Sequence, residues 1–120
     1  MRSANESPRT PLPGIPVRGS TTGRPMMAAL DLLGQRWTLR VIWELQQEPV
    51  GFRELRRRAD TMSSSVLADR LRRLTEAGIV QTDQDGRYAL TELGRGLGPA
   101  LEPLRTWARR WADSSPPASQ

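Results

Sequence analysis

The sequence contains no cysteine and no histidine. Their absence excludes a disulfide framework, a thiol redox switch and a Cys/His zinc site. Catalysis would then need a constellation of carboxylates or serines. The serines at 63–65 have no base beside them, and the acidic residues are scattered among arginines. We therefore predict that the protein is not an enzyme and uses no metal and no cofactor.

Lysine is also absent, so all 18 basic residues are arginine, against 13 acidic residues. The net charge is +5 and the isoelectric point is about 11.3, which favours an anionic partner. Charge alone does not distinguish nucleic acid from a membrane surface. Guanidinium groups nevertheless suit phosphates and guanine edges better than ammonium groups do.

Long apolar runs are missing as well. The longest is far too short to span a bilayer, and no charged-then-apolar signal sequence opens the chain. We therefore expect no membrane partner and a cytoplasmic, nucleoid-associated location. The length of 120 residues leaves room for one domain.

Apolar residues are scarce at both ends of the chain. Residues 1–25 carry five prolines and three glycines, without a helical or strand period. We predict a disordered Pro/Arg-rich tail over 1–25 and a second disordered tail over 114–120. The N-terminal tail is either a solvated segment or an arm that touches DNA phosphate through its arginines. These arginines are Arg2, Arg9, Arg18 and Arg24.

Two helical patterns with a short polar break between them occupy residues 52–78. Each pattern has apolar residues three and four positions apart, so each predicts a helix with one buried face. Ser63 is suited to cap the second helix, and Gly78 to end it in the left-handed conformation. Two short helices, a tight turn and a basic exterior predict a helix-turn-helix. The apolar faces are Phe52, Leu55 and Ala59, and then Leu67, Leu71 and Leu74.

The face of the second helix opposite its leucines is the predicted DNA-binding surface. Serines at the helix N-terminus lie where backbone donors and the helix dipole attract phosphate. The arginines either grip phosphates or a guanine edge, or are simply solvated. Asp69 either accepts from cytosine N4 or forms a salt bridge with a neighbouring arginine. The predicted DNA-binding residues are Arg53, Ser63, Ser64, Ser65, Ala68, Asp69, Arg72, Arg73 at the flank, and Arg87.

A hairpin signal follows Gly78, because Asp85-Gly86 stands between two short β-type runs. Asp-Gly favours a type I′ turn, which needs positive φ at its centre. A hairpin directly after a recognition helix is the wing of a winged helix. The alternative is a plain β-turn that only returns the chain.

Further helical patterns flank this unit on both sides. Pro25 is expected to open a helix that ends at Gly34. Residues 37–47 are apolar on nearly every side of a helix, so we expect burial on nearly every side. Thr91 is expected to cap a last helical region, in which Gly98-Pro99 predicts a kink or a short break.

The chain has more apolar surface than a recognition unit and a wing can cover, because small domains bury little of their surface. We predict that the first and last helices pair with their copies across a two-fold axis in a homodimer. The alternative is a monomer whose last helix folds back over its own domain. A tryptophan-lined gap at the interface could also admit a flat aromatic effector. The predicted interface residues are Met26, Leu30, Leu33, Leu97, Leu101, Leu104, Trp107 and Trp111.

Several spaced motifs lie over roughly residues 24–112: Gly34-Gln35-Arg36-Trp37, Phe52-Arg53-Glu54-Leu55, Ser63, Leu-Thr-Glu-Leu-Gly at 90–94, and Trp107. Together they resemble the HxlR family of bacterial winged-helix regulators. The resemblance implies a mainly α fold with a small β-hairpin: a winged helix-turn-helix domain over 26–113 with extra N- and C-terminal dimerisation helices. It also implies a sequence-specific transcriptional regulator of double-stranded DNA, binding an inverted-repeat operator as a homodimer with the 63–77 helix in the major groove.

Three departures from the family pattern limit what is carried over. Family members often have a cysteine just before the proline that opens the first helix, but Arg24 stands there, so thiol sensing is not implied. Gly51 replaces the usual arginine before Phe52, and with it a backbone contact. The hairpin also lacks the extended loop that would insert deeply into the minor groove. The alternative function is a winged-helix module for protein–protein interaction without direct DNA readout, although an ordinary protein interface would tend to deplete arginine-rich charge at its core.

Overall fold

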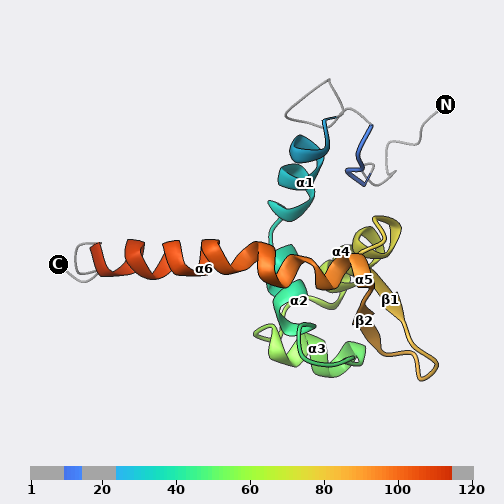
Figure 1. The fold of residues 1–120 in the computed structure, drawn as a ribbon. Helices are drawn as coiled ribbons and strands as arrows, with labels where there is room; N and C mark the ends of the chain where they lie inside the picture. Colours follow the sequence, from blue (N-terminus) through green and yellow to red (C-terminus); the bar gives the residue numbers. More distant parts are fainter. Residues whose placement is uncertain (1–9, 15–23, 115–120) are drawn as a thin grey trace.

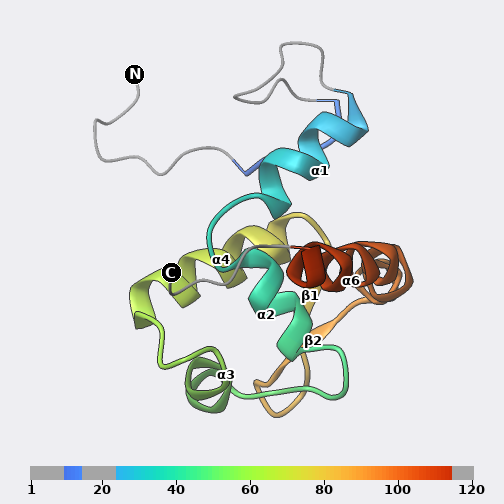
Figure 2. The ribbon, with the colours of Figure 1, turned by 90° about the vertical axis from the view of Figure 1, so that its left-hand side faces the viewer.

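The computed structural model describes residues 10–14 and 24–114. The fold is mainly α with one antiparallel hairpin, as predicted. Figures 1 and 2 show a body formed by α2 to β2, with α1 and α6 extending away from it. The elements are α1 (Pro25–Leu33), α2 (Thr38–Glu44), α3 (Phe52–Arg58), α4 (Ser64–Glu76), β1 (Val80–Thr82), β2 (Tyr88–Leu90), α5 (Glu92–Arg95) and α6 (Leu97–Ser114).

The core lies where α2, α3 and α4 meet the hairpin. Leu67, Leu71 and Leu74 of α4 are buried, so the predicted leucine face is confirmed. Each such burial contributes roughly 1.5–3 kcal/mol to the free energy of unfolding. The predicted face of α3 is confirmed too, since Leu55 and Ala59 are fully buried and Phe52 packs against the core.

The ends of α4 follow the predicted capping residues. The Ser63 hydroxyl accepts a hydrogen bond from the Val66 N–H at 3.4 Å, and Gly78 has a φ of 79° just after the helix. In the preceding turn, Asp60 and Thr61 both have positive φ, at 59° and 53°. These left-handed residues reverse the chain between α3 and α4.

The hairpin exists as predicted, but its turn type differs. A type I′ turn needs positive φ at both central residues, Asp85 and Gly86. Of these two described residues, only Gly86 has a positive φ, so the type I′ prediction is wrong. Asp83 accounts for the difference. Its Oδ1 accepts from the N–H groups of Asp85 and Arg87 at 2.9 Å each, which stabilises a three-residue loop ending in a left-handed glycine.

Helix α2 is less enclosed than its sequence predicts. Val41 and Ile42 are fully buried, but the Trp43 side chain is 48% exposed, so burial on nearly every side is wrong. The guanidinium of Arg105, from α6, lies 5.5 Å from the Trp43 ring centroid and covers one ring face. Gly34 ends α1 as predicted, but its backbone is right-handed. The left-handed residue of this segment is Trp37, with a φ of 77°.

The C-terminal helical region begins and divides as predicted. Thr91 caps it, since its hydroxyl accepts from the Gly94 N–H at 3.0 Å. The short break expected near Gly98-Pro99 falls at Gly96, between α5 and α6. Pro99 lies in the first turn of α6, where its missing N–H would have no helical partner.

Part of the predicted N-terminal tail is ordered against the body. Thr10 and Pro11 are buried, and the Thr10 hydroxyl donates to a carboxylate oxygen of Glu76 at the end of α4. Residues 10–14 therefore differ from the predicted disordered tail. The remaining tail residues, 1–9, 15–23 and 115–120, lie outside the described residues, as do Arg2, Arg9 and Arg18.

Gly94 is the last residue of the Leu-Thr-Glu-Leu-Gly motif at 90–94, and close packing requires a glycine there. A Cβ at this buried position would lie 2.2 Å from the backbone oxygen of Ile79. Helix α5 therefore packs on the start of the hairpin only because residue 94 has no side chain.

We expect Gly94→Ala to lower the free energy of unfolding by about 1–3 kcal/mol, because backbone atoms must move to relieve the clash. Gly51→Ala is the matched control: no atom lies within 4 Å of its Cβ position, and its φ is −71°. The control should change the stability by less than about 0.5 kcal/mol. Urea unfolding followed by circular dichroism measures both, and equal effects would contradict the packing argument.

Candidate nucleic-acid interface

The outer face of α4 consists of Ser64, Ser65, Ala68, Asp69 and Arg72, opposite the buried leucines. The two serines, Ala68 and Arg72 are exposed, and Asp69 is partly exposed. The first turn of α4 therefore presents small side chains and free backbone N–H groups to solvent. Such a surface allows close approach of a phosphate or a base edge.

Two arginines that the sequence analysis did not select hold the turn before α4. Arg40 of α2 pairs with Asp60 in the turn at 2.9 Å, and its guanidinium also donates to the Arg58 backbone oxygen at 2.6 Å. Arg56 of α3 donates to the Met62 backbone oxygen at 2.6 Å. Because these contacts join residues distant in sequence, no local pattern indicates them.

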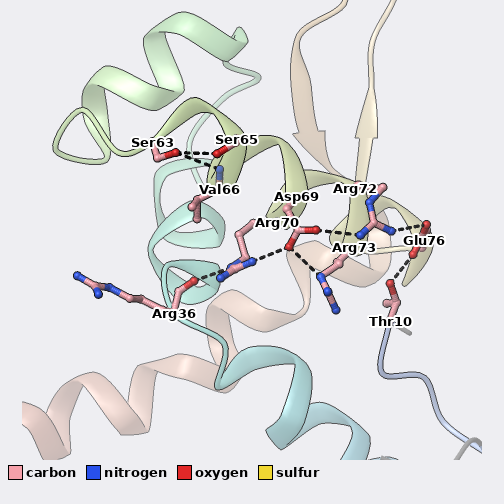
Figure 3. Close-up of polar contacts among 10 residues, drawn as sticks. All are labelled: Thr10, Arg36, Ser63, Ser65, Val66, Asp69, Arg70, Arg72, Arg73 and Glu76. Atoms are coloured by element: carbon pink, nitrogen blue, oxygen red, sulfur yellow. Dashed lines mark hydrogen bonds and ion pairs between the residues drawn. The ribbon is translucent and has the colours of Figure 1, made fainter. Parts of the chain in front are cut away.

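Asp69 is the centre of a charge network on α4 (Figure 3). It accepts from Arg70 at 2.6 Å and from both Arg72 and Arg73 at 2.9 Å. Arg70 also donates to the Arg36 backbone oxygen at 2.7 Å, which ties α4 to the segment between α1 and α2. The salt-bridge alternative predicted for Asp69 is therefore present.

The protonation of Asp69 reflects two opposed effects. Burial raises the pKa of the carboxyl group, but the hydrogen bonds from Arg72 and Arg73, with their positive charges, outweigh it. The pKa of Asp69 consequently lies below its ordinary value of 3.8. The network is therefore fully charged at neutral pH.

Arg72 and Arg73 occupy different environments. Arg72 is 42% exposed and bridges Asp69 at 2.9 Å and Glu76 at 3.0 Å. Arg73 is buried, with 7% of its side chain exposed, so its predicted place at the flank of the exposed face is wrong. It sits beside the leucine face and is neutralised by Asp69, a partner four residues away that makes burial of the charge tolerable.

Arg53 lies at a hollow beside the N-terminus of α4. The hollow has a volume of about 430 Å³ and is lined by α3, the turn and Ser64. Arg53 is exposed and has no hydrogen-bond or ionic partner among the described residues. Arg56 and Arg57 line the same hollow, so it suits an anion.

The positive charge of Arg87 on the wing is offset by two neighbouring aspartates. The Arg87 guanidinium pairs with Asp83 at 3.0 Å and with Asp85 at 3.3 Å. Hydrogen bonds from the Arg87 and Asp85 N–H groups, together with the Arg87 charge, lower the pKa of Asp83. A phosphate near the wing tip would therefore meet two carboxylates as well as the guanidinium.

The predicted interface residues lie on the two helices that leave the body. Five of them are exposed, and Leu33, Leu97 and Leu101 are partly buried. No residue of α6 is buried. Trp107 and Trp111 stack on each other with ring centroids 5.7 Å apart, so each covers a face of the other. The exposed five are Met26, Leu30, Leu104, Trp107 and Trp111.

The described residues provide neither a metal-binding group nor a membrane-spanning helix. They contain no group of three or more acidic, cysteine or histidine side chains that could hold a metal ion. Within these ranges, no helix is both long and apolar enough to cross a membrane.

Comparisons with known proteins agree with this geometry. A sequence model of the family described as HxlR-like helix-turn-helix matches residues 32–116. The uncharacterized HTH-type transcriptional regulator YvaP of Bacillus subtilis (strain 168) is 31% identical over 93 residues, which cover 72% of this chain and 86% of YvaP. The HTH-type transcriptional regulator YodB of the same strain is 31% identical over 101 residues, covering 79% and 90%. The crystal structure of quinone-bound YodB superposes with a TM-score of 0.67 at 33% identity, over 71% of this chain and 94% of that one.

Asp69→Asn should lower the free energy of unfolding at neutral pH by about 1 kcal/mol, because it removes the charge that three arginines share. The folded-state pKa of Asp69 is depressed, so its contribution is present above pH 3.8 and is lost as the pH falls through the lower folded value. The difference between wild type and variant should therefore shrink towards about pH 3.

Urea unfolding of both proteins across this pH range measures that difference. The exposed Asp113→Asn provides a control at the end of α6. A difference between wild type and Asp69→Asn that is independent of pH would contradict the charge network.

Proposed function

The chain belongs to the HxlR-like helix-turn-helix family and is a DNA-binding transcriptional regulator, and from this premise we propose its mode of binding. A homodimer places one α4 from each protomer in successive major grooves of an inverted-repeat operator. The two recognition helices then lie about 34–36 Å apart, one turn of B-DNA.

The outer face of α4 is the observation that carries this proposal. Its first turn has only small side chains, so the backbone of α4 approaches the DNA closely. Arg72 projects from the same face two turns later and reaches a guanine edge or a phosphate. Asp69 and Glu76 hold its guanidinium from two sides, which reduces the conformational entropy lost on binding.

Arg53 supports a separate role in gripping the DNA backbone. Its guanidinium carries no internal counter-charge in the described part of the chain, and it lies beside the N-terminus of α4. Phosphate contacts position a protein on DNA without reading sequence. We assign Arg53 to positioning and Arg72 to readout, with Arg73 supporting α4 from inside. Arg87 is paired with two carboxylates, as Arg72 is, but it lies on the wing and not on the outer face of α4, so we assign it no part in readout.

The homodimer is supported by apolar surface that one protomer leaves uncovered. The exposed apolar side chains on the two outer helices are Leu104, Trp107 and Trp111 of α6 and Met26 and Leu30 of α1. Both helices extend away from the body (Figure 1). Apolar side chains clustered on an exposed surface mark contacts with another protein surface. A two-fold axis lets each face meet its own copy.

Effector control in this chain would differ from a cysteine-based mechanism. The related YodB has been crystallised with quinone bound. This chain has no cysteine, and Arg24 precedes the proline that opens α1. No effector of this protein is therefore held through a cysteine, and the predicted aromatic effector at a tryptophan-lined gap between protomers stays a prediction.

DNA affinity should fall steeply with salt, because bound phosphates release counterions. Arg72→Ala should weaken binding to the preferred duplex by about 1–3 kcal/mol and reduce sequence preference. Arg53→Ala should weaken binding to all duplexes alike and reduce the salt slope by about 1.

Duplexes selected from random DNA, followed by titration at several salt concentrations, measure these effects. Arg109→Ala removes one exposed arginine from α6 and should leave sequence preference unchanged. If neither salt nor Arg72→Ala alters binding to any duplex, the proposed DNA contact is wrong.

The homodimer should persist at micromolar concentration in sedimentation equilibrium. Leu104→Glu or Trp107→Glu should shift the mass towards the monomer, because either change places a charge in an apolar interface. Thr106→Glu is the matched control, since its exposed side chain lies on the opposite side of α6. A monomer mass for the wild type that these variants do not change would contradict the proposed homodimer.

A further inference from the structure

An apolar cavity of about 370 Å³ lies between α1, the end of α4 and the junction of α5 with α6. Residues 10–14, which we call the strap, contribute one of its walls. The strap is anchored by the buried Thr10, which donates to Glu76. Figure 3 shows Thr10 beside the C-terminal end of α4. Six of the lining residues are Pro11, Leu12, Ala29, Leu33, Ile79 and Leu97.

The chemistry of the lining restricts the ligand. Among the residues that the structure describes, no charged side chain lines the cavity, and its walls are aliphatic, proline, alanine and glycine residues. A charged ligand would lose its hydration there without gaining a partner. An aliphatic cavity of this kind is poorly hydrated and takes up apolar molecules.

The size and construction of the cavity favour a small molecule. Ligand sites in proteins have volumes of roughly 300–1,000 Å³, and this cavity falls in that range. Its walls come from four separate parts of one protomer. The strap lies upstream of residues 32–116, the part of the chain that matches the family model.

We propose that this cavity is a binding site for a neutral, apolar small molecule of one or two rings, held without a covalent bond. The site is separate from the outer face of α4 and from the exposed tryptophans of α6. Leu33 and Leu97 of its lining are also predicted dimer-interface residues, but the whole lining comes from one protomer, so the site does not depend on the proposed DNA contacts.

Toluene and benzoate test the site on the full-length protein, since they differ mainly in charge. Toluene should produce saturable shifts in the methyl resonances of Leu33, Ile79 and Leu97. Benzoate should bind at least about tenfold more weakly, because burial of its carboxylate has no compensation. Absence of a saturable toluene shift at these methyls would overturn the proposal, including the case in which side chains of a second copy fill the cavity.

Ala29→Phe should occupy the cavity with its own ring and weaken toluene binding by at least about tenfold. Ala100→Phe adds the same ring at an exposed position of α6 outside the lining and should leave binding unchanged. Leu12→Asp, on the strap, is a second variant that places a charge in the wall without altering the core. Toluene binding that survives both Ala29→Phe and Leu12→Asp would place the ligand elsewhere and contradict the proposal.

Discussion

Burial of the leucine face of α4 is the interaction on which the rest of the structure depends. Leu67, Leu71 and Leu74 join α4 to the core shared by α2, α3 and the hairpin. Their helical spacing also fixes which residues point outward, so one apolar pattern determines both the stability and the exposed recognition surface. A shift of one residue along α4 would bury Ala68 and Arg72 and destroy both at once.

The arginine content has an effect that net charge alone does not describe. Arg40, Arg58, Arg70, Arg72 and Arg87 all pair with acidic side chains within the chain. These pairs hold the guanidinium groups in defined positions but reduce the charge that DNA meets. Arg53 has no ionic partner among the described residues, whereas the guanidinium of Arg72 is held between two carboxylates. The first arrangement favours general attraction to phosphate, and the second favours recognition of a fixed target.

Local patterns predicted the helices, their caps and the hairpin, because these depend on neighbouring residues. The same patterns failed where distant contacts or side-chain hydrogen bonds determine the burial of a residue or the conformation of a turn. The helical pattern predicts an exposed Arg73, because arginine is charged. The structure buries it, because Asp69 one turn away neutralises the charge. The wing turn follows the Asp83 side chain more than the Asp-Gly pair. On the outer face of α4, the serines and Ala68 are exposed as the leucine pattern predicts. The arginines that brace the turn before α4 were missed, because their acceptors are 6 to 20 residues away.

Two apolar features lie outside the core, and their shapes indicate different occupants. The face of α6 is open, extended and rich in leucine and tryptophan, with no residue buried. Only a surface of similar extent can cover it, which favours a second protomer. The cavity under the strap is small and aliphatic, and it is lined by several elements of one chain. Because its wall is fastened to Glu76, which also holds Arg72, a molecule that moves the strap would change the support of the residue proposed to read DNA.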